Sequence, residues 1–335
     1  MQARAQSLAA PSSTNTPASR VVIVQDSDAT DNLQPVPDRI QAMVDRGITN
    51  LTRQATVQAA WNSLVSSKDI IGIKVLTSPG PISGTRRAVV AAVVQDLLKT
   101  GVPPHNIIVW DRRLSDLRAA GYFDLARRFK IRVQGSIESG YDEKIFYETP
   151  LLGALSADDV EFGRKGPGVG RKSYVCKLVA QELTKIINIT PMLHHNVVGV
   201  SGNLFSLAFG SVDNIGRFED KAEDMSRAIP EIWALALNTN DVRLGDRVVL
   251  NIVDALICQY DGQDRGLLQY SAVVNQLRFS KDPVALDVLS LMEINSQREQ
   301  ADVPATKTSM ELYSNASLLE IGVSDTNHIQ VEKVR

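Results

Sequence analysis

Four short apolar runs and one long periodic segment dominate the pattern of hydrophobic positions. The runs at 20–25, 70–77, 106–111 and 247–254 have the length and composition of buried strands. Between the second and third runs, residues 85–100 place one face of a helix in apolar side chains: Val89, Val90, Val93, Leu97 and Leu98. A strand, a helix and another apolar strand form the pattern of a right-handed crossover in a parallel sheet covered on both faces.

The remaining pattern extends this alternation of strands and helices. We expect an α/β protein with a layered, mostly parallel central sheet flanked by helices and an irregular middle segment. No internal repeat or linker divides residues 20–335, so they are predicted to form a single elaborated domain. Further helices are expected at 38–47, 52–64, 201–209 and 230–237, and after Asp282, which precedes Pro283; further strands are expected at 130–135, 143–149, 185–191 and 329–334.

Composition excludes several classes of partner. The chain has 36 basic and 38 acidic residues, a net charge of −2, so nothing in its charge favours a nucleic acid. No run is long and apolar enough to predict a membrane span. Two cysteines, Cys176 and Cys258, are too few for an iron–sulfur cluster. Both lie in apolar runs, which favours buried free thiols and leaves a disulfide between them as an alternative.

The first 19 residues differ from the rest of the chain. Residues 1–19 are rich in Ser, Thr, Ala, Pro, Gln and Asn and lack an apolar face, which predicts a disordered tail. Ala3-Arg4-Ala5 resembles the small-residue pattern at a signal-peptide cleavage site. We therefore expect a periplasmic or otherwise exported protein, with a cytoplasmic one as the alternative.

Polar residues at the ends of the predicted strands are the first candidates for a site. Open α/β sheets bind ligands at the carboxyl ends of their strands. Lys74 interrupts an apolar strand, and Asp111 and Asp254 each end one. A lysine in such a run is costly to bury unless it is paired or reaches water. Lys74 is therefore either part of a site or a structural ion-pair partner of Asp111 or Asp254.

The segment 189–218 holds the densest cluster of unusual residues. Two of the four histidines, His194 and His195, are adjacent in it, and Ser201 and Asn203 open an apolar helix. The N-terminus of a buried helix offers N–H groups that suit a carboxylate or phosphate. The alternative is an ordinary helix cap formed by Ser201 itself.

Taken together, these blocks resemble the family called domain of unknown function 362. The resemblance runs from about Val21 to Val334, through IGIKV, NIIVWDR with LRAAGY, HHNVVGVSGNLFSLAFG, the strand that ends at Asp254, and FSKDPVALD. It implies that five residues have equivalents in shared motifs of the family: Lys74, Asp111, His195, Ser201 and Asp282. It also implies that some members are exported and that others carry a ferredoxin-like module, which the two cysteines of this chain cannot supply.

This chain departs from the family pattern in three motifs. The family usually has Asn where Leu76 stands, Lys where Leu193 precedes the histidines, and Lys-Asn where Phe205-Ser206 stands. Two cations and two amides are therefore missing. An anion site in this member is expected to rely on Lys74, Arg217 and helix N–H groups.

Two further interpretations concern the histidines and a glycine-rich loop. Adjacent residues on a strand point to opposite faces, so His194 and His195 could share a metal ion only at a turn, with Asp213 as an oxygen ligand. His195 alone suits a general base or a core residue bonded to backbone. The loop 163–173 has four cations and four glycines but fits neither phosphate-binding fingerprint, so it is expected to be a mobile loop, free or closing over an acidic ligand.

The leading hypothesis is a protein that binds or processes a small anionic molecule at the strand ends. Its catalytic candidates are His195 as acid or base, Lys74 as charge stabiliser, and Asp111 and Asp254 to orient them. Ligand contacts are assigned to Ser201, Asn203, Asp213 and Arg217. The alternative is a noncatalytic exported binding protein that uses the same pocket. No cofactor is identified by the sequence.

Overall fold

The fold is described from a computed structural model that places residues 19–149, 170–219, 221–262 and 265–335. The predicted tail, 1–19, lies outside these ranges except for Ser19, which begins the first strand. Most of the predicted loop 163–173 also lies outside them, and its last two residues, Lys172 and Ser173, begin a strand.

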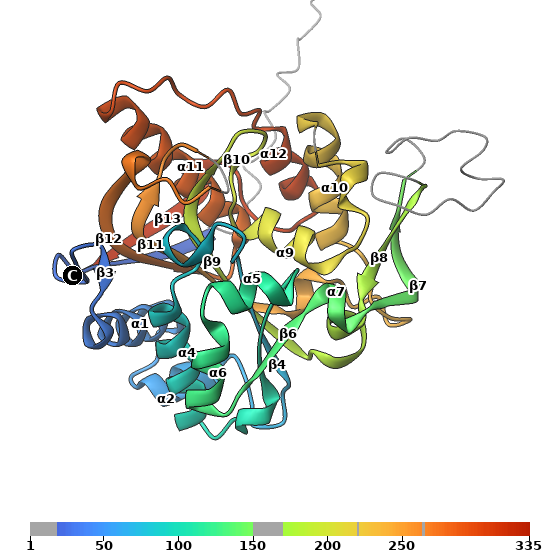
Figure 1. The fold of residues 1–335 in the computed structure, drawn as a ribbon, viewed down its shortest axis with the longest axis horizontal. Coiled ribbons are helices and arrows are strands. Elements are labelled where there is room, and N and C mark those ends of the chain that lie inside the picture. Colours follow the sequence, from blue (N-terminus) through green and yellow to red (C-terminus); the bar gives the residue numbers. More distant parts are fainter. Residues whose placement is uncertain (1–18, 150–169, 220, 263–264) are drawn as a thin grey trace, which may run out of the picture.

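A single large sheet forms the centre of the molecule (Figure 1). Its strand order is β13-β1-β12-β11-β9-β4-β5-β6, and β10 pairs with β9. Every pair along this order is parallel except the two that β12 makes, so the predicted mostly parallel sheet is confirmed. The strands are β1 (Ser19–Gln25), β4 (Ile71–Val75), β5 (Ile107–Asp111), β6 (Arg132–Gly135), β9 (Lys185–His195), β10 (Gly199–Val200), β11 (Val248–Gln259), β12 (Ser271–Ser280) and β13 (Ile329–Val334).

Helices cover both faces of this sheet, as expected for buried parallel strands (Figure 1). One apolar core lies under α1 (Pro37–Thr52), α2 (Val57–Asn62), α4 (Arg87–Lys99) and α6 (Tyr122–Phe129). A second core lies under the helices of the opposite face: α9 (Asn203–Ser211), α10 (Ala222–Trp233), α11 (Pro283–Gln300) and α12 (Glu311–Leu318). The α/β fold class is thus confirmed.

The middle of the chain is irregular, as the sequence predicted. A hairpin of β7 (Tyr141–Glu148) and β8 (Lys172–Cys176) stands apart from the main sheet. Short elements surround it or fill the loops: β2 (Thr30–Asp31), β3 (Gln34–Pro35), α3 (Gly80–Ser83), α5 (Leu114–Ala119) and α7 (Ser136–Ser139), with single turns at 104–106, 178–182, 215–217, 245–247, 268–270 and 326–328.

The direction in which successive strands are added to the sheet reverses at β4. From β4 the chain moves to β5 and β6 on one side, and the next strand of the sheet, β9, pairs with the other side of β4. A crevice at the carboxyl ends of the strands is expected where the direction of winding reverses. The junction of β4 and β9 is such a point.

Several element boundaries differ from the sequence-based expectation. The first helix begins after Val36, so Asp38 is not its cap, and it continues through Gly47 to Thr52. Gly47 does not end the helix but allows it to pack closely on Phe279, whose ring a side chain at this position would overlap. Pro230 lies inside α10 and does not begin it. The predicted cap at Asp282 is confirmed, since its carboxylate accepts the Ala285 N–H at 2.9 Å.

Two features of composition can be checked on the described residues. Cys176 and Cys258 are both buried and free, so the alternative of a disulfide is excluded. Within the ranges that the structure places, none of the helices is both long enough and apolar enough to cross a bilayer.

Candidate functional site

A cavity of about 480 Å³ opens where β4, β5 and β9 end. Four of the residues that the sequence nominated line it: Lys74, Asp111, His195 and Ser201. The other lining residues come from β9, from α5, from the loops after β4, β5 and β9, from α9, and from the segment that follows α9: Leu76, Ser78, Pro79, Arg112, Arg113, Asp116, Leu193, Val197, Phe205, Ser206, Phe209, Gly210, Ile215 and Glu219.

Lys74 lies at the buried floor of this cavity. Its side chain has no exposed surface, and its ammonium donates to Val75 O at 2.7 Å, Asp111 Oδ1 at 2.9 Å and Ser206 Oγ at 2.9 Å. All three hydrogens of the ammonium therefore have acceptors. Burial lowers the pKa of Lys74, while the charge of Asp111 acts in the opposite direction. Gly210 leaves the space in which the lysine stem lies.

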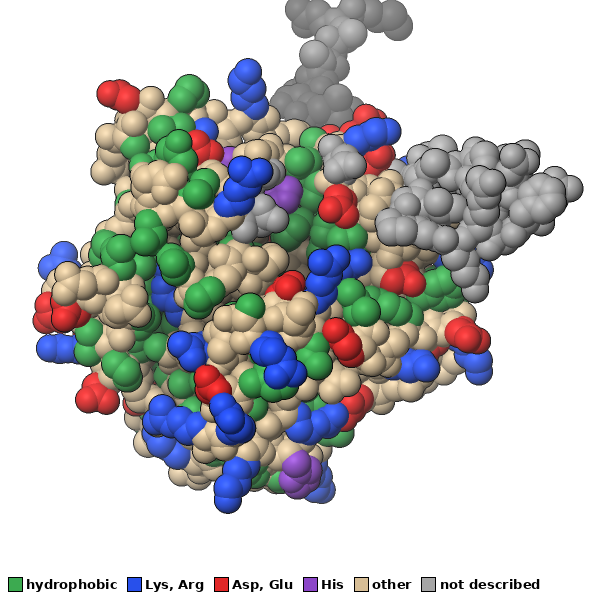
Figure 2. All heavy atoms as spheres, viewed as in Figure 1, with side chains coloured by type: hydrophobic (Ala, Val, Ile, Leu, Met, Phe, Trp, Pro, Cys, Tyr) green, Lys and Arg blue, Asp and Glu red, His purple; other side chains and the backbone are tan. Residues whose placement is uncertain are grey.

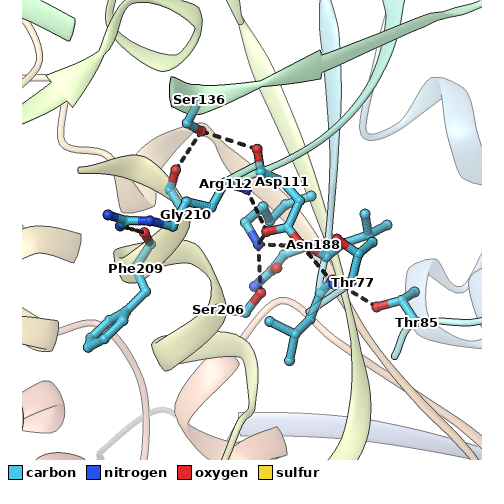
Figure 3. Close-up of polar contacts among 12 residues, drawn as sticks. Thr77, Thr85, Asp111, Arg112, Ser136, Asn188, Ser206, Phe209 and Gly210 are labelled. Carbon is cyan, nitrogen blue, oxygen red and sulfur yellow. Dashed lines mark hydrogen bonds and ion pairs between the residues drawn. The ribbon is translucent and has the colours of Figure 1, made fainter. Parts of the chain in front are cut away.

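Asp111 is held as firmly as its partner. Its Oδ1 accepts from Lys74 and from the Arg112 N–H at 2.8 Å. Its Oδ2 accepts from both the N–H and the hydroxyl of Thr77, at 2.8 and 2.6 Å (Figure 3). Four donors satisfy the carboxylate, so both groups of this buried ion pair have their partners within the protein and are not free reactive groups.

Ser206 connects this pair to the cavity. Its oxygen accepts from Lys74, it is 1% exposed, and it lines the cavity. Among the described residues no acceptor is found for its own hydroxyl proton. A hydroxyl that already accepts from an ammonium is a strengthened donor, because successive hydrogen bonds polarise one another. The floor of the cavity therefore offers a donor.

Arg112 supplies a guanidinium to the same cavity. One of its nitrogens donates to Phe209 O and Val212 O, both at 3.2 Å, at the end of α9 (Figure 3). Ser136 donates to Gly210 O at 2.6 Å and fixes the same turn. The end of α9 is thus anchored to the loops that follow β5 and β6, and Arg112 is held in place beside Asp111.

His195 forms the opposite wall. Its Nδ1 accepts from the N–H groups of Val197 at 3.1 Å and Val198 at 3.3 Å. An acceptor nitrogen carries no proton, so the neutral ring carries its proton on Nε2. The ring packs on Phe205, with centroids 4.7 Å apart. In this neutral tautomer Nε2 is a donor, and a role of His195 as acid or base stays a prediction.

Charged side chains surround this site at the surface. Arg113 and Glu219 are exposed, and Asp116 is half-buried. Figure 2 shows Lys and Arg side chains over the region of α5 and α6. Solvent screens such charges, so the buried donors weigh more in deciding what the cavity holds.

Comparison with known sequences identifies a family. The family described as Domain of unknown function (DUF362) matches residues 71–292, more than half of the chain and the part that contains the cavity. The chain belongs to this family. A search of curated proteins finds no match. Among solved structures, a protein from Thermotoga maritima is similar at 10% identity and a TM-score of 0.40, over 80% of this chain and 60% of the other. The DUF362 chain therefore spans less than two thirds of that protein.

Asp254 of this DUF362 chain does not line the cavity. Its carboxylate forms a buried ion pair with Arg86 at 3.0 Å and also accepts the Arg86 backbone N–H at 2.9 Å. The expected role of orienting Lys74 is therefore not supported by its position. Asp254 holds the start of α4 against the middle of β11, which continues to Gln259 and so extends beyond the predicted strand end.

The predicted anion site at the N-terminus of α9 is occupied by a carboxylate of the protein itself. The buried Asp287 of α11 accepts the N–H groups of Asn203 and Leu204 at 2.7 and 2.8 Å, and the Asn203 side chain at 3.0 Å. Asn203 does not line the cavity, and its assignment as a ligand contact stays a prediction. Burial raises the pKa of Asp287 to about 7. Ser201 does line the cavity, while its N–H donates to Leu193 O.

Arg217 and Asp213 also lie away from the cavity lining. The buried guanidinium of Arg217 donates to Ser173 Oγ at 3.1 Å and to carbonyls of the β7–β8 hairpin. Asp213 accepts the Tyr174 N–H at 2.6 Å, and burial raises its pKa. Both residues connect the hairpin to the turn after α9, and their contact with a ligand stays a prediction.

His194 occupies the other face of β9 from His195. It is buried, and its Nδ1 lies 3.7 Å from Asp261, which also pairs with Arg298. Burial is the main cause that lowers the pKa of His194 to about 4. Across the described ranges no three His, Cys, Asp or Glu side chains are grouped to hold a metal ion. The two histidines therefore do not form the suggested metal site.

Sequence reasoning missed the main donors of the cavity. Arg112 follows Asp111 directly, and its position after a buried strand was the same signal that nominated the aspartate. Ser206 was noted as a departure from the family pattern, where Asn is usual. Ser206 is in the first turn of α9 and accepts from Lys74, so it carries the effect of the lysine's charge to the cavity.

Proposed function

We propose that this DUF362 protein binds a small molecule through an acidic group in the cavity at the ends of β4, β5 and β9. The observation that carries the proposal is the contact of Ser206 with Lys74 at 2.9 Å. This contact leaves the serine hydroxyl to donate into the cavity, with a buried positive charge directly behind it. A carboxylate or phosphate oxygen is the acceptor that such a donor favours.

Two neighbouring groups support an acidic ligand. Arg112 brings a guanidinium to the lining, and His195 is a donor at Nε2 in its neutral form. Guanidinium groups bind carboxylates and phosphates with paired, charge-assisted hydrogen bonds. The donors come from three different elements, so they approach the cavity from its floor and its walls.

The internal contacts favour binding over reaction. Lys74 and Asp111 satisfy each other and their neighbours, and His195 carries its proton on Nε2. The groups that the sequence nominated for proton transfer and charge stabilisation are therefore committed to holding the cavity. We propose a ligand-binding function first, with catalysis on the bound molecule as the second candidate to be examined by turnover assays.

Calorimetric titration with simple acids tests the proposal. Arg112→Met and Ser206→Ala should each weaken binding of benzoate or naphthoate by about 1 to 3 kcal/mol, which is about 5- to 150-fold in affinity. Arg118→Met is the matched control, since Arg118 is exposed on α5 and does not line the cavity. Failure of both acids to bind, or equal affinity in the Arg112 and Arg118 variants, would contradict the proposal.

A further inference from the structure

A continuous row of aromatic rings runs along the cavity wall formed by α9. Phe205 and Phe209 are four residues apart, so they lie on one face of the helix. Their ring centroids are 4.3 Å apart, His195 packs on Phe205 at 4.7 Å, and Phe218 meets Phe209 edge-on at 5.4 Å. The first three rings of this row, His195, Phe205 and Phe209, line the cavity.

A second row on the same helix is polar and lies beside the aromatic one. Ser206 and Gly210 each follow an aromatic residue by one position, so they occupy the adjacent strip of α9. Both line the cavity, and both contact Lys74: Ser206 accepts its hydrogen bond, and Gly210 has no side chain where the lysine stem lies. One helix thus presents an apolar aromatic strip and a donor strip side by side.

The rest of the lining continues this division. Leu76, Leu193, Val197 and Ile215 add aliphatic surface, while Arg112 adds charge next to the donor strip. A cavity of about 480 Å³ falls within the range that holds drug-sized ligands. The two strips are therefore large enough to be met by one molecule with two chemically distinct parts.

We infer that the ligand is a planar aromatic acid whose ring packs on Phe205 and Phe209 while its acidic group meets Ser206 and Arg112. This inference rests on the proposed function and names its ligand class. Aromatic rings pack against each other in offset or edge-on arrangements that aliphatic rings of equal carbon number cannot reproduce. His195, Phe205 and Phe209 already pack on one another in tilted arrangements of this kind, and all three line the cavity.

Matched acids separate this inference from the proposed function. Calorimetric titrations compare naphthoate with its fully saturated counterpart, benzoate with cyclohexanecarboxylate, and benzoate with benzyl alcohol. The aromatic acid should bind about 2- to 10-fold more tightly than the saturated acid, and the alcohol more weakly than benzoate. Equal binding of aromatic and saturated acids would overturn the aromatic class and leave the proposed function standing. Absence of binding by every acid would overturn both.

A pair of variants locates the preference. Phe205→Leu keeps an apolar side chain and removes the ring, so it should abolish the preference for aromatic over saturated acids while still binding both. Phe129→Leu is the control, because Phe129 is half-buried on α6 and packs in the core under the opposite face of the sheet. An unchanged aromatic preference in Phe205→Leu would show that another surface selects the ring and would overturn the inference.

Discussion

Lys74 Nζ lies 2.9 Å from Asp111 Oδ1, and the two side chains are 0% and 6% exposed. The pair joins β4 to the last residue of β5, and it supports both the floor of the cavity and the position of Ser206. Two residues nominated as chemical groups therefore act together as the structural base of the site. Their contribution to stability can be separated from their contribution to binding.

Removing one member of this pair should destabilise the protein strongly. Lys74→Met leaves the Asp111 carboxylate buried without its counter-charge, and a loss of about 3 to 5 kcal/mol is expected. Asp111→Asn should also be costly, and the double variant should lose less than the sum of the two single losses because neither charge then remains unpaired. Urea unfolding of the four proteins measures the coupling.

The exposed pair of Arg127 and Asp124 is the control for this cycle. Its side chains are 81% and 64% exposed, so solvent and salt weaken the interaction. Asp124→Asn should change the free energy of unfolding by less than about 0.5 kcal/mol. Strict additivity of the Lys74 and Asp111 substitutions would contradict the description of a coupled buried pair.

The tautomer of His195 leads to a second prediction. In His195→Phe the N–H groups of Val197 and Val198 lose their acceptor, so a loss of about 1 to 3 kcal/mol is expected. In His195→Asn the side-chain oxygen can accept from the same turn, as asparagine does in Asx turns, and the loss should be smaller. Urea unfolding and amide hydrogen exchange at Val197 and Val198 measure both effects. Equal losses would show that Nδ1 is not the acceptor.

The spacing of hydrophobic positions predicted most of the central fold, because buried strands and amphipathic helices each have a characteristic spacing of apolar residues. The strand at 70–77, the helix at 85–100 and the next strand at 106–111 all appear within a few residues of the predicted bounds. The helix α10 was misplaced because Pro230 was interpreted as a start. Pro230 instead lies near the C-terminal end of α10, where only a few helix residues follow it.

The candidate site was predicted in part, and the failures share one physical cause. Lys74 and Asp111 were found because a charge in an apolar strand must be paired or solvated. Asn203, Asp254 and Arg217 look similar in sequence, but each is satisfied by a partner distant along the chain: Asp287, Arg86 and the β7–β8 hairpin. Sequence shows which polar groups are buried, whereas tertiary structure determines which of them face a cavity.

Gly210 provides a third prediction, since it makes room for the lysine stem. A methyl group at this position would overlap Cε of Lys74, so Gly210→Ala should cost about 1 to 3 kcal/mol of stability. In a Lys74→Ala background the stem is gone, and the same glycine substitution should cost less. Thermal or urea unfolding of the four proteins tests the contact. An equal cost in both backgrounds would show that the two residues do not meet.

Asp287 caps α9 from behind the cavity, and its pKa predicts a defined pH dependence of stability. Burial raises this pKa to about 7 in the folded protein, against the ordinary 3.8. Between about pH 4 and 7 the folded chain therefore holds a proton that the unfolded chain has lost. Raising the pH through this window should destabilise the wild type by up to about 1.4 kcal/mol per pH unit, with no further loss above pH 7.

Asp287→Asn has no such proton. The difference in unfolding free energy, wild type minus variant, should accordingly fall as pH rises from about 4 to 7 and then level off. Titrating groups that do not interact with Asp287, such as Asp96 and His194, contribute equally in both proteins and cancel in the difference, whereas the charge of Asp282 helps to raise the pKa of Asp287 and is part of the measured effect. Urea unfolding at several pH values measures it, and a constant difference would show that Asp287 is ionised throughout.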